Sequence, residues 1–362
     1  MKEYTISAAE SGQKCISFCK HILPKAQNGF LYKMLRKKNI TLNGKKADAA
    51  TALQTGDIVR FYFADETFAM LQDAGNVPKE QGGAKSEKPA AAADVRERIL
   101  YEDEDILIWN KPAGVLSQKA KPEDISANEL LLDYLHQQNA ASRGFVPSVA
   151  NRLDRNTSGA LLFGKSYRGS RLLSGLLQSR DLAKYYRCLV LGKMQAAHLK
   201  GRLIKDEKTN TVTVWNEENA APKRGALPEN ADYIETEFVP LQFLTIQTGD
   251  AAKGAAPGDT AKGAAADGGK LSATLLEVHL ITGKPHQIRA HLASVGHPIL
   301  GDPKYGKDAV NRLLKKQFAV HRQLLHAYRV EFPALPEDFV NLSARTFTAP
   351  LPEDMTKILQ HQ

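Results

Sequence analysis

The chain has 362 residues, 43% of them hydrophobic, and a formal net charge of +9. This length favours two domains, and the apolar fraction suffices for a folded core. No apolar run approaches the about 18 residues of a membrane-spanning helix, and the first residues lack the apolar stretch of a secretory signal. The small, odd number of cysteines, three, argues against a disulfide framework. We therefore expect a cytoplasmic protein with no membrane partner.

Residues 1–73 are expected to form a small module of two helices and a hairpin. Apolar residues recur at helical spacing over 15–23 and 30–35. A short strand is expected at 40–42, and the dipeptide Asn43-Gly44 that follows it is a strong hairpin signal.

Most of the excess positive charge of the chain lies in this module. Between Gly12 and Arg60, ten Lys and Arg residues face two Asp and Glu residues, a net charge of +8. Such a concentration attracts polyphosphates such as RNA, although it also suits a solubilising surface. The candidate RNA-binding residues crowd around the second helix and the hairpin turn, and they are Lys33, Arg36, Lys37, Lys38, Lys45 and Lys46.

Two segments of low complexity divide the rest of the chain. Residues 74–94 are rich in Ala, Gly, Lys, Pro and Glu and cannot bury enough apolar surface to order, so they predict a flexible linker. Residues 95–362 then form the second domain. Residues 248–270, which lack large apolar side chains, predict a disordered extension of a hairpin loop within it, with an RNA-contacting tail as the alternative.

The second domain is expected to have an α+β fold. Helical spacing is found over 171–177 and 286–295. Strands are expected over 105–109, 160–163, 185–191, 241–246 and 275–281. Several of these strands lack an intervening helix, which favours α+β over a doubly wound fold.

The most informative stretch is Asn151–Gly159, which reads NRLDRNTSG. An aspartate among Asn, Thr, Ser and Gly is most often a turn former or a helix cap. Arg152 and Arg155 flank Asp154, however, and their charges favour an ionised and available carboxylate. A strand follows directly and would hold the carboxylate at the edge of a sheet.

This stretch resembles the signature of the RluA-type RNA pseudouridine synthases, written His-Arg-Leu-Asp-x-x-Thr-Ser-Gly. Three more segments resemble the same family in the same order: NKPAG at 110–114, KYYRCLVLG at 184–192, and 277–306 with TGKPHQIR and GHPILGDP. The resemblance covers about residues 95–345. It implies a mixed, mainly antiparallel sheet with flanking helices. The basic module before it resembles the alpha-L RNA-binding module first seen in a small-subunit ribosomal protein.

The resemblance implies that a uridine in RNA has its base detached at the ribose bond, rotated and rejoined through carbon, without a cofactor or a metal. Asp154 matches the catalytic aspartate, acting as a nucleophile or stabilising a ribose-derived intermediate. Arg289 matches the arginine that pairs with it, and Tyr186 matches the tyrosine that stacks on the base. Without the resemblance, the simpler interpretation of Arg289 is an exposed helix arginine, and that of Tyr186 is a half-buried strand tyrosine. Since His286 and Arg289 share one helix face, we expect Arg289 to be free to point toward the site.

Further residues are expected to contact the substrate. Arg152 matches the arginine that occupies the space left by the extruded base, with a phosphate contact or a surface ion pair as the alternative. The other expected substrate-binding residues are Arg155, Lys184, His286 and Gln287. Asn151 departs from the family's histidine and cannot titrate near neutral pH, which puts a proton-transfer role at this position in doubt. His286, His291 and His297 are not spaced for a metal site.

Large-subunit ribosomal RNA or its precursor is the first expected partner, because the basic module is typical of that branch, and transfer RNA is the second. The alternative class is a non-catalytic RNA-binding or ribosome-assembly factor on the same scaffold. We expect a monomer with no obligate protein partner.

Overall fold

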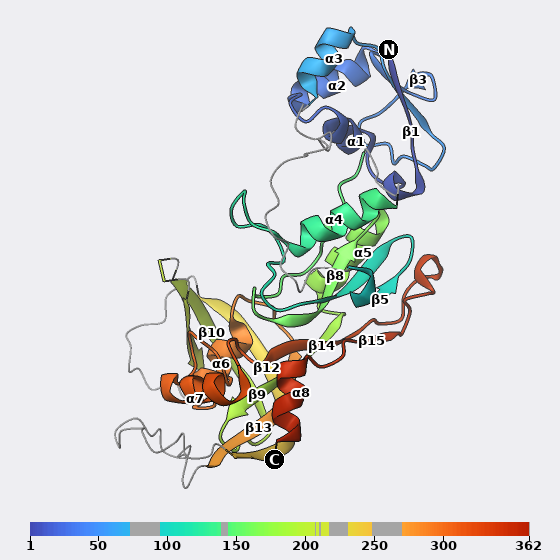
Figure 1. Ribbon diagram of the computed structural model, residues 1–362. Coiled ribbons are helices and arrows are strands. Elements are labelled where there is room, and N and C mark those ends of the chain that lie inside the picture. Colours follow the sequence, from blue (N-terminus) through green and yellow to red (C-terminus); the bar gives the residue numbers. More distant parts are fainter. Residues whose placement is uncertain are drawn as a thin grey trace. The chain divides into compact units, whose positions relative to one another are not determined.

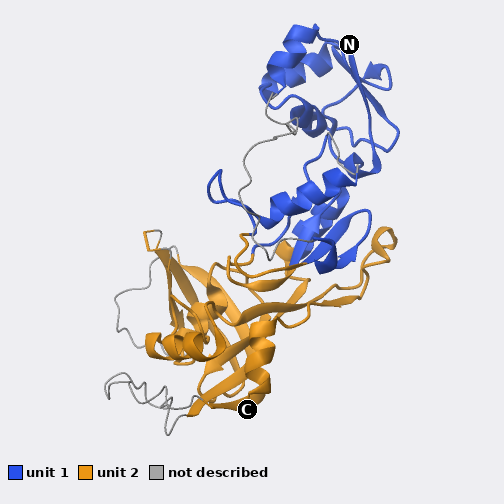
Figure 2. Ribbon diagram, viewed as in Figure 1, with its two compact units in different colours: residues 1–109, 117–152, 161–176 blue, residues 110–116, 153–160, 177–362 orange. Residues whose placement is uncertain are grey.

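A computed structural model describes residues 1–72, 95–138, 144–206, 208–209, 211–216, 231–247 and 270–361 (Figure 1). The predicted linker and residues 248–269 of the predicted insertion lie outside these described residues. The chain divides into two compact units (Figure 2). Residues 1–109, 117–152 and 161–176 form the first unit, and residues 110–116, 153–160 and 177–362 form the second. The domain boundaries expected from the linker, 1–73 and 95–362, stay a prediction.

The first 72 residues of the first unit contain a four-stranded sheet with the order β1-β4-β2-β3. Its strands are β1 (Lys2–Thr5), β2 (Ile40–Leu42), β3 (Lys45–Lys46) and β4 (Ile58–Phe61), and its helices are α1 (Cys15–Ile22), α2 (Asn28–Arg36) and α3 (Asp65–Leu71). The two expected helices and the hairpin are confirmed, and α3 and β1 add to them. Asn43 and Gly44 both have positive φ, 51° and 73°, as a two-residue hairpin turn requires. Phe18, Leu31 and Phe61 lie in the core of this part and are at most 1% exposed.

The rest of the first unit consists of strands and two helices. These elements are β5 (Ile99–Glu102), β6 (Ile106–Lys111), α4 (Ala127–Gln137), β7 (Ser148–Val149), β8 (Ser158–Gly164) and α5 (Tyr167–Ser179). The last residues of β6 and the first residues of β8 belong to the second unit. Strand β8 is apolar and wholly buried, so it anchors the chain directly after the Asn151–Gly159 stretch.

The second unit is built on a sheet with the strand order β11-β10-β12-β13-β9-β14. Its elements are β9 (Ala183–Leu191), β10 (Ala197–Asp206), β11 (Thr211–Asn216), β12 (Asp232–Gln247), β13 (Lys270–Leu280), α6 (Gln287–Ser294), α7 (Asp308–Phe318), β14 (Leu325–Glu331), β15 (Thr346–Thr348) and α8 (Glu353–Gln360). Neighbouring strands in this order are antiparallel. The start of β8 joins β14 in parallel, with His326 opposite Ser158. The expected α+β fold with a mainly antiparallel sheet is thus confirmed.

Helices α7 and α8 supply part of the core that supports this sheet. Leu314 of α7 and Met355 of α8 are completely buried in one cluster with Leu189 of β9 and Leu275 of β13. Strand β9 alternates, so that Tyr186 is buried whereas Tyr185 stacks on His279 of β13. The sheet therefore presents Tyr185 and Tyr186 to different surroundings, as the period of two of a strand requires.

Among the described residues, no helix combines the length and the apolar character needed to cross a membrane. Cys15, Cys19 and Cys188 are all buried and free.

Candidate active site

Asp154 lies in a turn between two buried segments. Leu153 before it is 7% exposed, and β8 begins at Ser158. The amide of Thr157 donates to the carbonyl of Asp154 over 3.0 Å, which closes the turn. The side chain of Asp154 is 27% exposed, so the carboxylate is half-buried and still open to a substrate.

Two buried basic side chains hold the turn through its carbonyl groups. Lys111 Nζ donates to the carbonyl of Arg155 over 3.1 Å, and also to those of Pro112 and Val115. Arg322 Nη1 donates to the carbonyl of Asn156 over 3.1 Å. Lys111 is completely buried, and Arg322 is 9% exposed. Because the two carbonyl groups after Asp154 accept hydrogen bonds from buried side chains, the backbone that carries the Asp154 carboxylate is held in place.

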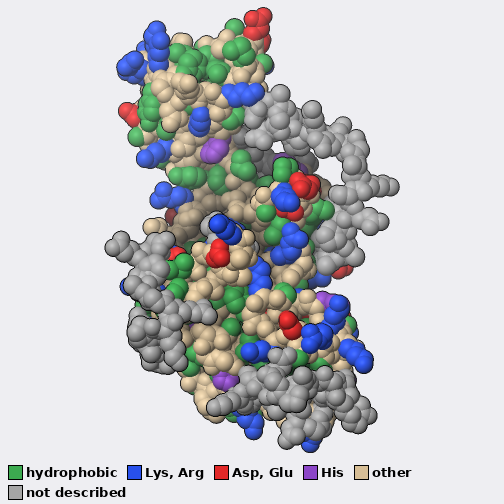
Figure 3. Space-filling model, turned by 90° about the vertical axis from the view of Figure 1, so that its left-hand side faces the viewer, with side chains coloured by type: hydrophobic (Ala, Val, Ile, Leu, Met, Phe, Trp, Pro, Cys, Tyr) green, Lys and Arg blue, Asp and Glu red, His purple; other side chains and the backbone are tan. Residues whose placement is uncertain are grey.

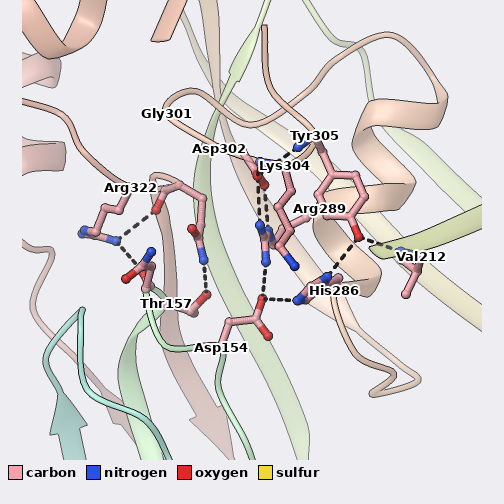
Figure 4. A network of polar contacts seen from close by, with 12 residues as sticks. Asp154, Thr157, Val212, His286, Arg289, Gly301, Asp302, Lys304, Tyr305 and Arg322 are labelled. Atoms are coloured by element: carbon pink, nitrogen blue, oxygen red, sulfur yellow. Dashed lines mark hydrogen bonds and ion pairs between the residues drawn. The ribbon is translucent and has the colours of Figure 1, made fainter. Parts of the chain in front are cut away.

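Arg289 joins Asp154 to a second carboxylate (Figure 4). Its Nη1 donates to Asp154 Oδ2 over 2.8 Å, while Nε and Nη2 donate to the two oxygens of Asp302 over 2.7 and 2.9 Å. Burial would lower the pKa of Arg289, but the hydrogen bonds and charges of Asp302 and Asp154 raise it above its ordinary value. Arg289 therefore stays charged and has one orientation, which is the property that a planar guanidinium contributes.

Arg289 points toward Asp154, as expected, but it is buried and held by Asp302, so the alternative of an exposed helix arginine is wrong. The helix is α6, which begins at Gln287, and Arg289 is only 4% exposed. Its charge is buried because Asp302 compensates it. The Asp302 side chain is fully buried, and it also accepts the backbone amides of Lys304 and Tyr305. The contact of Arg289 with Asp154 that the resemblance implied is present.

His286 lies immediately before α6 and close to the same carboxylate. Its backbone is left-handed, with φ 55° and ψ 13°. Nε2 is 4.0 Å from Asp154 Oδ2, and Nδ1 is 2.9 Å from the hydroxyl of Tyr305. Burial lowers the pKa of His286 below its ordinary value, although the Asp154 carboxylate opposes this. The imidazole is therefore mainly neutral at pH 7.

Tyr186, the predicted base-stacking residue, lies close enough to Asp154 to feel its charge. It belongs to β9, where it pairs with Val278 on one side and Ala327 on the other, and it is 6% exposed. Burial, and then the charge of Asp154, raises the pKa of its phenol above the ordinary value. No described residue forms a hydrogen bond with the Tyr186 hydroxyl. The contact of Tyr186 with a substrate base stays a prediction.

A comparison with models of protein families matches residues 105–294 to RNA pseudouridylate synthase. The chain belongs to this family. It is an RNA pseudouridine synthase, an isomerase whose substrate is RNA.

Two named relatives and a solved structure resemble this synthase. The ribosomal large subunit pseudouridine synthase C of Haemophilus ducreyi is 28% identical over 361 residues, which cover 98% of this chain and 94% of that protein. The protein of the same name from Vibrio cholerae is 28% identical, covering 89% of this chain and 85% of its own. The solved structure of human RNA pseudouridylate synthase domain containing 4 has a TM-score of 0.53 and 22% identity, and covers 75% of this chain and 94% of its own, which supports the fold.

The other predicted substrate-binding residues of the synthase differ in their surroundings. Arg152 and Arg155 are exposed. Lys184 is 9% exposed, and burial, with the nearby Arg180, lowers the pKa of its amine. The amide of Gln287 donates to the carbonyl of Glu235 and to Thr236, and accepts from Thr282 and Lys284, so it is occupied within the protein. Substrate contacts of these four residues stay predictions.

Asn151 has a local structural contact. Its Oδ1 accepts the backbone amide of Leu162 over 2.8 Å. The Asn151 side chain therefore accepts a β8 backbone amide, as a neighbouring strand's carbonyl group would. The contact needs only an acceptor, which Asn supplies without a titratable group at the position where the family signature has His.

The synthase exposes all six predicted RNA-binding residues of the N-terminal part, which lies at the top of the view in Figure 3. They occur in two groups, one at the end of α2 and one on β3. No ion pair with another described residue neutralises them. This part lies outside the family match, so its resemblance to a ribosomal-protein RNA-binding module stays a prediction.

Sequence reasoning gave no role to Asp302, Tyr305, Lys111 and Arg322. The first three lie within segments that carry the family resemblance, which was the signal available for them. Arg322 lies outside the quoted segments, and its contact with Asn156 is long-range. Among the described residues, no group of three or more His, Cys, Asp or Glu side chains is placed to hold a metal.

Proposed function

We propose that this synthase isomerises uridines of large-subunit ribosomal RNA, with Asp154 as the catalytic carboxylate, Arg289 as its partner and Tyr186 as the residue that stacks on the base. The observation that carries the assignment of the site is the 2.8 Å contact of Arg289 Nη1 with Asp154 Oδ2, backed by the two contacts of Arg289 with Asp302. The proposed RNA target rests on relatives named for the large ribosomal subunit, which match at least 85% of their own length to this chain.

The reaction needs a carboxylate beside the ribose. The bond between the base nitrogen and the ribose carbon breaks, the base rotates, and a carbon of the base bonds to the same ribose carbon. One proton leaves that carbon of the base and the nitrogen gains one, so the product is an isomer. Asp154 either attacks as a nucleophile or stabilises the positive charge that develops on the ribose. Either role requires an oriented carboxylate, and Arg289 supplies the orientation.

Tyr186 offers an aromatic face and a hydroxyl to the extruded base. Its pKa, raised by burial and by Asp154, keeps the phenol protonated. A stacked ring compensates for the lost stacking in the RNA, which costs a few kcal/mol per extruded base. Arg152, exposed and two residues before Asp154, is proposed to occupy the space that the base leaves in the RNA.

The unpaired basic residues on α2 and β3 are proposed to bind RNA phosphates. Their positive charges release counterions when they meet a phosphate backbone, which gives affinity without base specificity. A monomeric protein acting in the cytoplasm is part of the same proposal, and the free, buried state of all three cysteines suits a reducing compartment.

Mapping of pseudouridines in all stable RNAs, with and without the gene, tests this proposal. We expect specific sites in large-subunit ribosomal RNA to disappear in the deletion strain. Complementation with Asp154→Asn should leave them absent, whereas Asp133→Asn, an exposed aspartate on α4, should restore them. Purified Asp154→Asn should still bind ribosomal RNA.

Three outcomes would overturn parts of the proposal. Loss of sites only in transfer RNA would refute the target. Restoration of the sites by Asp154→Asn would refute the catalytic carboxylate. Identical pseudouridine maps in the two strains would favour a non-catalytic RNA-binding role.

A further inference from the structure

Tyr305 and His286 form a hydrogen-bonded pair beside Asp154, and the backbone amide of Val212 in β11 also contacts the Tyr305 hydroxyl (Figure 4). The backbone amide of Val212 donates to the Tyr305 hydroxyl over 2.8 Å. The same hydroxyl lies 2.9 Å from His286 Nδ1. A backbone amide can only donate, so the hydroxyl oxygen accepts there. The hydroxyl proton then needs an acceptor, and among the described residues His286 Nδ1 is the contacted atom that can accept it.

The protonation states of the two side chains agree with this direction. Burial raises the pKa of the Tyr305 phenol, so the hydroxyl keeps its proton. Burial lowers the pKa of His286, which favours the neutral ring. A neutral imidazole that accepts at Nδ1 has its proton on Nε2, the nitrogen that faces Asp154.

His286 and Arg289 approach the same oxygen of the carboxylate. His286 Nε2 is 4.0 Å from Asp154 Oδ2, which already accepts from Arg289 Nη1 over 2.8 Å. No described residue donates a hydrogen bond to Oδ1, and Figure 4 shows Oδ1 turned away from the network. A separation of 4.0 Å exceeds a hydrogen bond, but such contacts in catalytic sites commonly tighten when the substrate binds.

We propose that His286 is a positioning residue for Asp154: as a neutral Nε2–H donor whose tautomer is set by Tyr305, it acts with Arg289 on Oδ2 and thereby presents Oδ1 to the ribose. This inference rests on the proposed catalytic role of Asp154. It differs from the substrate contact that the sequence predicted for His286. His286 acts through the carboxylate, and its removal should therefore change the rate of the chemical step more than the affinity for RNA.

A matched pair of variants at position 286 isolates the donor. Gln and Met are both unbranched at Cβ and meet the same cost in the left-handed backbone at this position, φ 55°. Only Gln retains an N–H near Nε2. We expect His286→Gln to keep the single-turnover rate constant within about threefold of wild type, and His286→Met to lower it about tenfold, as expected for loss of one hydrogen bond to a charged group.

The rate is measured as tritium released from RNA labelled at the carbon of uridine that forms the new bond. The RNA is isolated from a strain that lacks the gene, so the assay does not depend on knowing the target. Half-saturating enzyme concentrations should agree within about twofold among wild type, Gln and Met variants. Equal rate constants for the Gln and Met variants, or a loss confined to half-saturation, would overturn the inference.

A double-mutant cycle tests the role of Tyr305. Tyr305→Phe removes the hydroxyl and leaves Nδ1 without its donor, so we expect it to lower the rate constant about fivefold in the wild-type background. In the His286→Met background the same change should have no further effect, because Tyr305 acts through His286. Independent, multiplying losses would contradict the proposed coupling.

The two proposals fail separately. Retained activity in Asp154→Asn would refute the catalytic carboxylate, and with it the basis of the inference. An inactive Asp154→Asn together with indistinguishable Gln and Met variants at position 286 would refute the inference alone.

Discussion

Replacement of Asp302 by Asn should damage both stability and catalysis, because it removes one charge from a buried pair. Asp302 is fully buried and accepts Nε and Nη2 of Arg289 over 2.7 and 2.9 Å. An asparagine side chain cannot reproduce both contacts: its amide nitrogen can only donate, so one of the two contacts with Arg289 becomes a meeting of two donors.

The expected magnitudes follow from the burial of the pair. Removal of one partner of a buried ion pair typically costs about 3–5 kcal/mol. For a folding unit of about 150–250 residues each kcal/mol lowers Tm by about 2–4 °C, so we expect the unit that holds Asp302 to lose roughly 10 °C. Arg289 would still contact Asp154, but its guanidinium would no longer be fixed in one orientation. We therefore expect kcat to fall about 10- to 100-fold, as when a residue that orients a functional side chain is removed.

Thermal melting and tritium release measured on the same preparations check this prediction. Asp232→Asn is the matched control, because Asp232 forms a 2.6 Å ion pair with Lys284 whose side chains are 50% and 39% exposed. Such a surface pair contributes at most about 1 kcal/mol. If Asp302→Asn melted and reacted like Asp232→Asn, the argument that Asp302 holds Arg289 would be refuted.

Three further changes have expected outcomes. Burial, with the charge of Arg322, lowers the pKa of Lys111 from an ordinary 10.5 to about 7, although the charge of Asp154 opposes this shift. Between these two pH values the unfolded chain binds more protons than the folded one, so the free energy of unfolding should rise with pH by at most about 1.4 kcal/mol per pH unit. Lys111→Met should remove this slope, which melts at several pH values would measure. A Cβ at Gly159, where φ is 112°, would lie 2.2 Å from the carbonyl oxygen of Ala327, so Gly159→Ala should lower the free energy of unfolding by about 3 kcal/mol or more. A Cβ at Gly175 in α5 meets nothing within 4 Å, so Gly175→Ala should raise it by up to about 1 kcal/mol. Denaturant unfolding of the two variants measures both changes. Replacing Lys45 and Lys46 by Gln should lower the slope of log K for RNA against log salt by about 1.5, whereas the same change at the exposed Lys315 and Lys316 of α7 should leave it unaltered.

Local patterns were sufficient where a segment follows one simple period. The hairpin at Asn43-Gly44 was predicted because its turn demands two residues with positive φ, and both have it. Strand β9 was predicted from 185–191 and extends only two residues further at its start. The hairpin depends on near neighbours. Strand β9 pairs with the distant β13 and β14, but its alternation is visible in its own residues.

Patterns failed where buried polar groups replace apolar ones. In α6, Gln287, Arg289 and His291 are buried along with the apolar residues. The polar residues of this helix therefore do not mark a solvent-exposed face. Arg289 is buried because of Asp302, a pairing across 13 positions that periodicity does not display. Helix α8 was not predicted either; its Asp354 binds Arg322, another long-range pair. The pairing of Asp154 with Arg289 came from the resemblance to a family, since they lie 135 positions apart.

The contact of Asn151 with the amide of Leu162 bears on how members of this family are recognised in genomes. In this chain the first position of the signature supplies a hydrogen-bond acceptor to a strand amide, a contact that other acceptor side chains could also make. A search that insists on histidine there would discard this chain, although its Asp154, Arg289 and Asp302 are in contact. A pattern that tolerates any acceptor at the first position, and instead requires the equivalents of Asp154, Arg289 and Asp302 together, would select for the arrangement of charges proposed for the site.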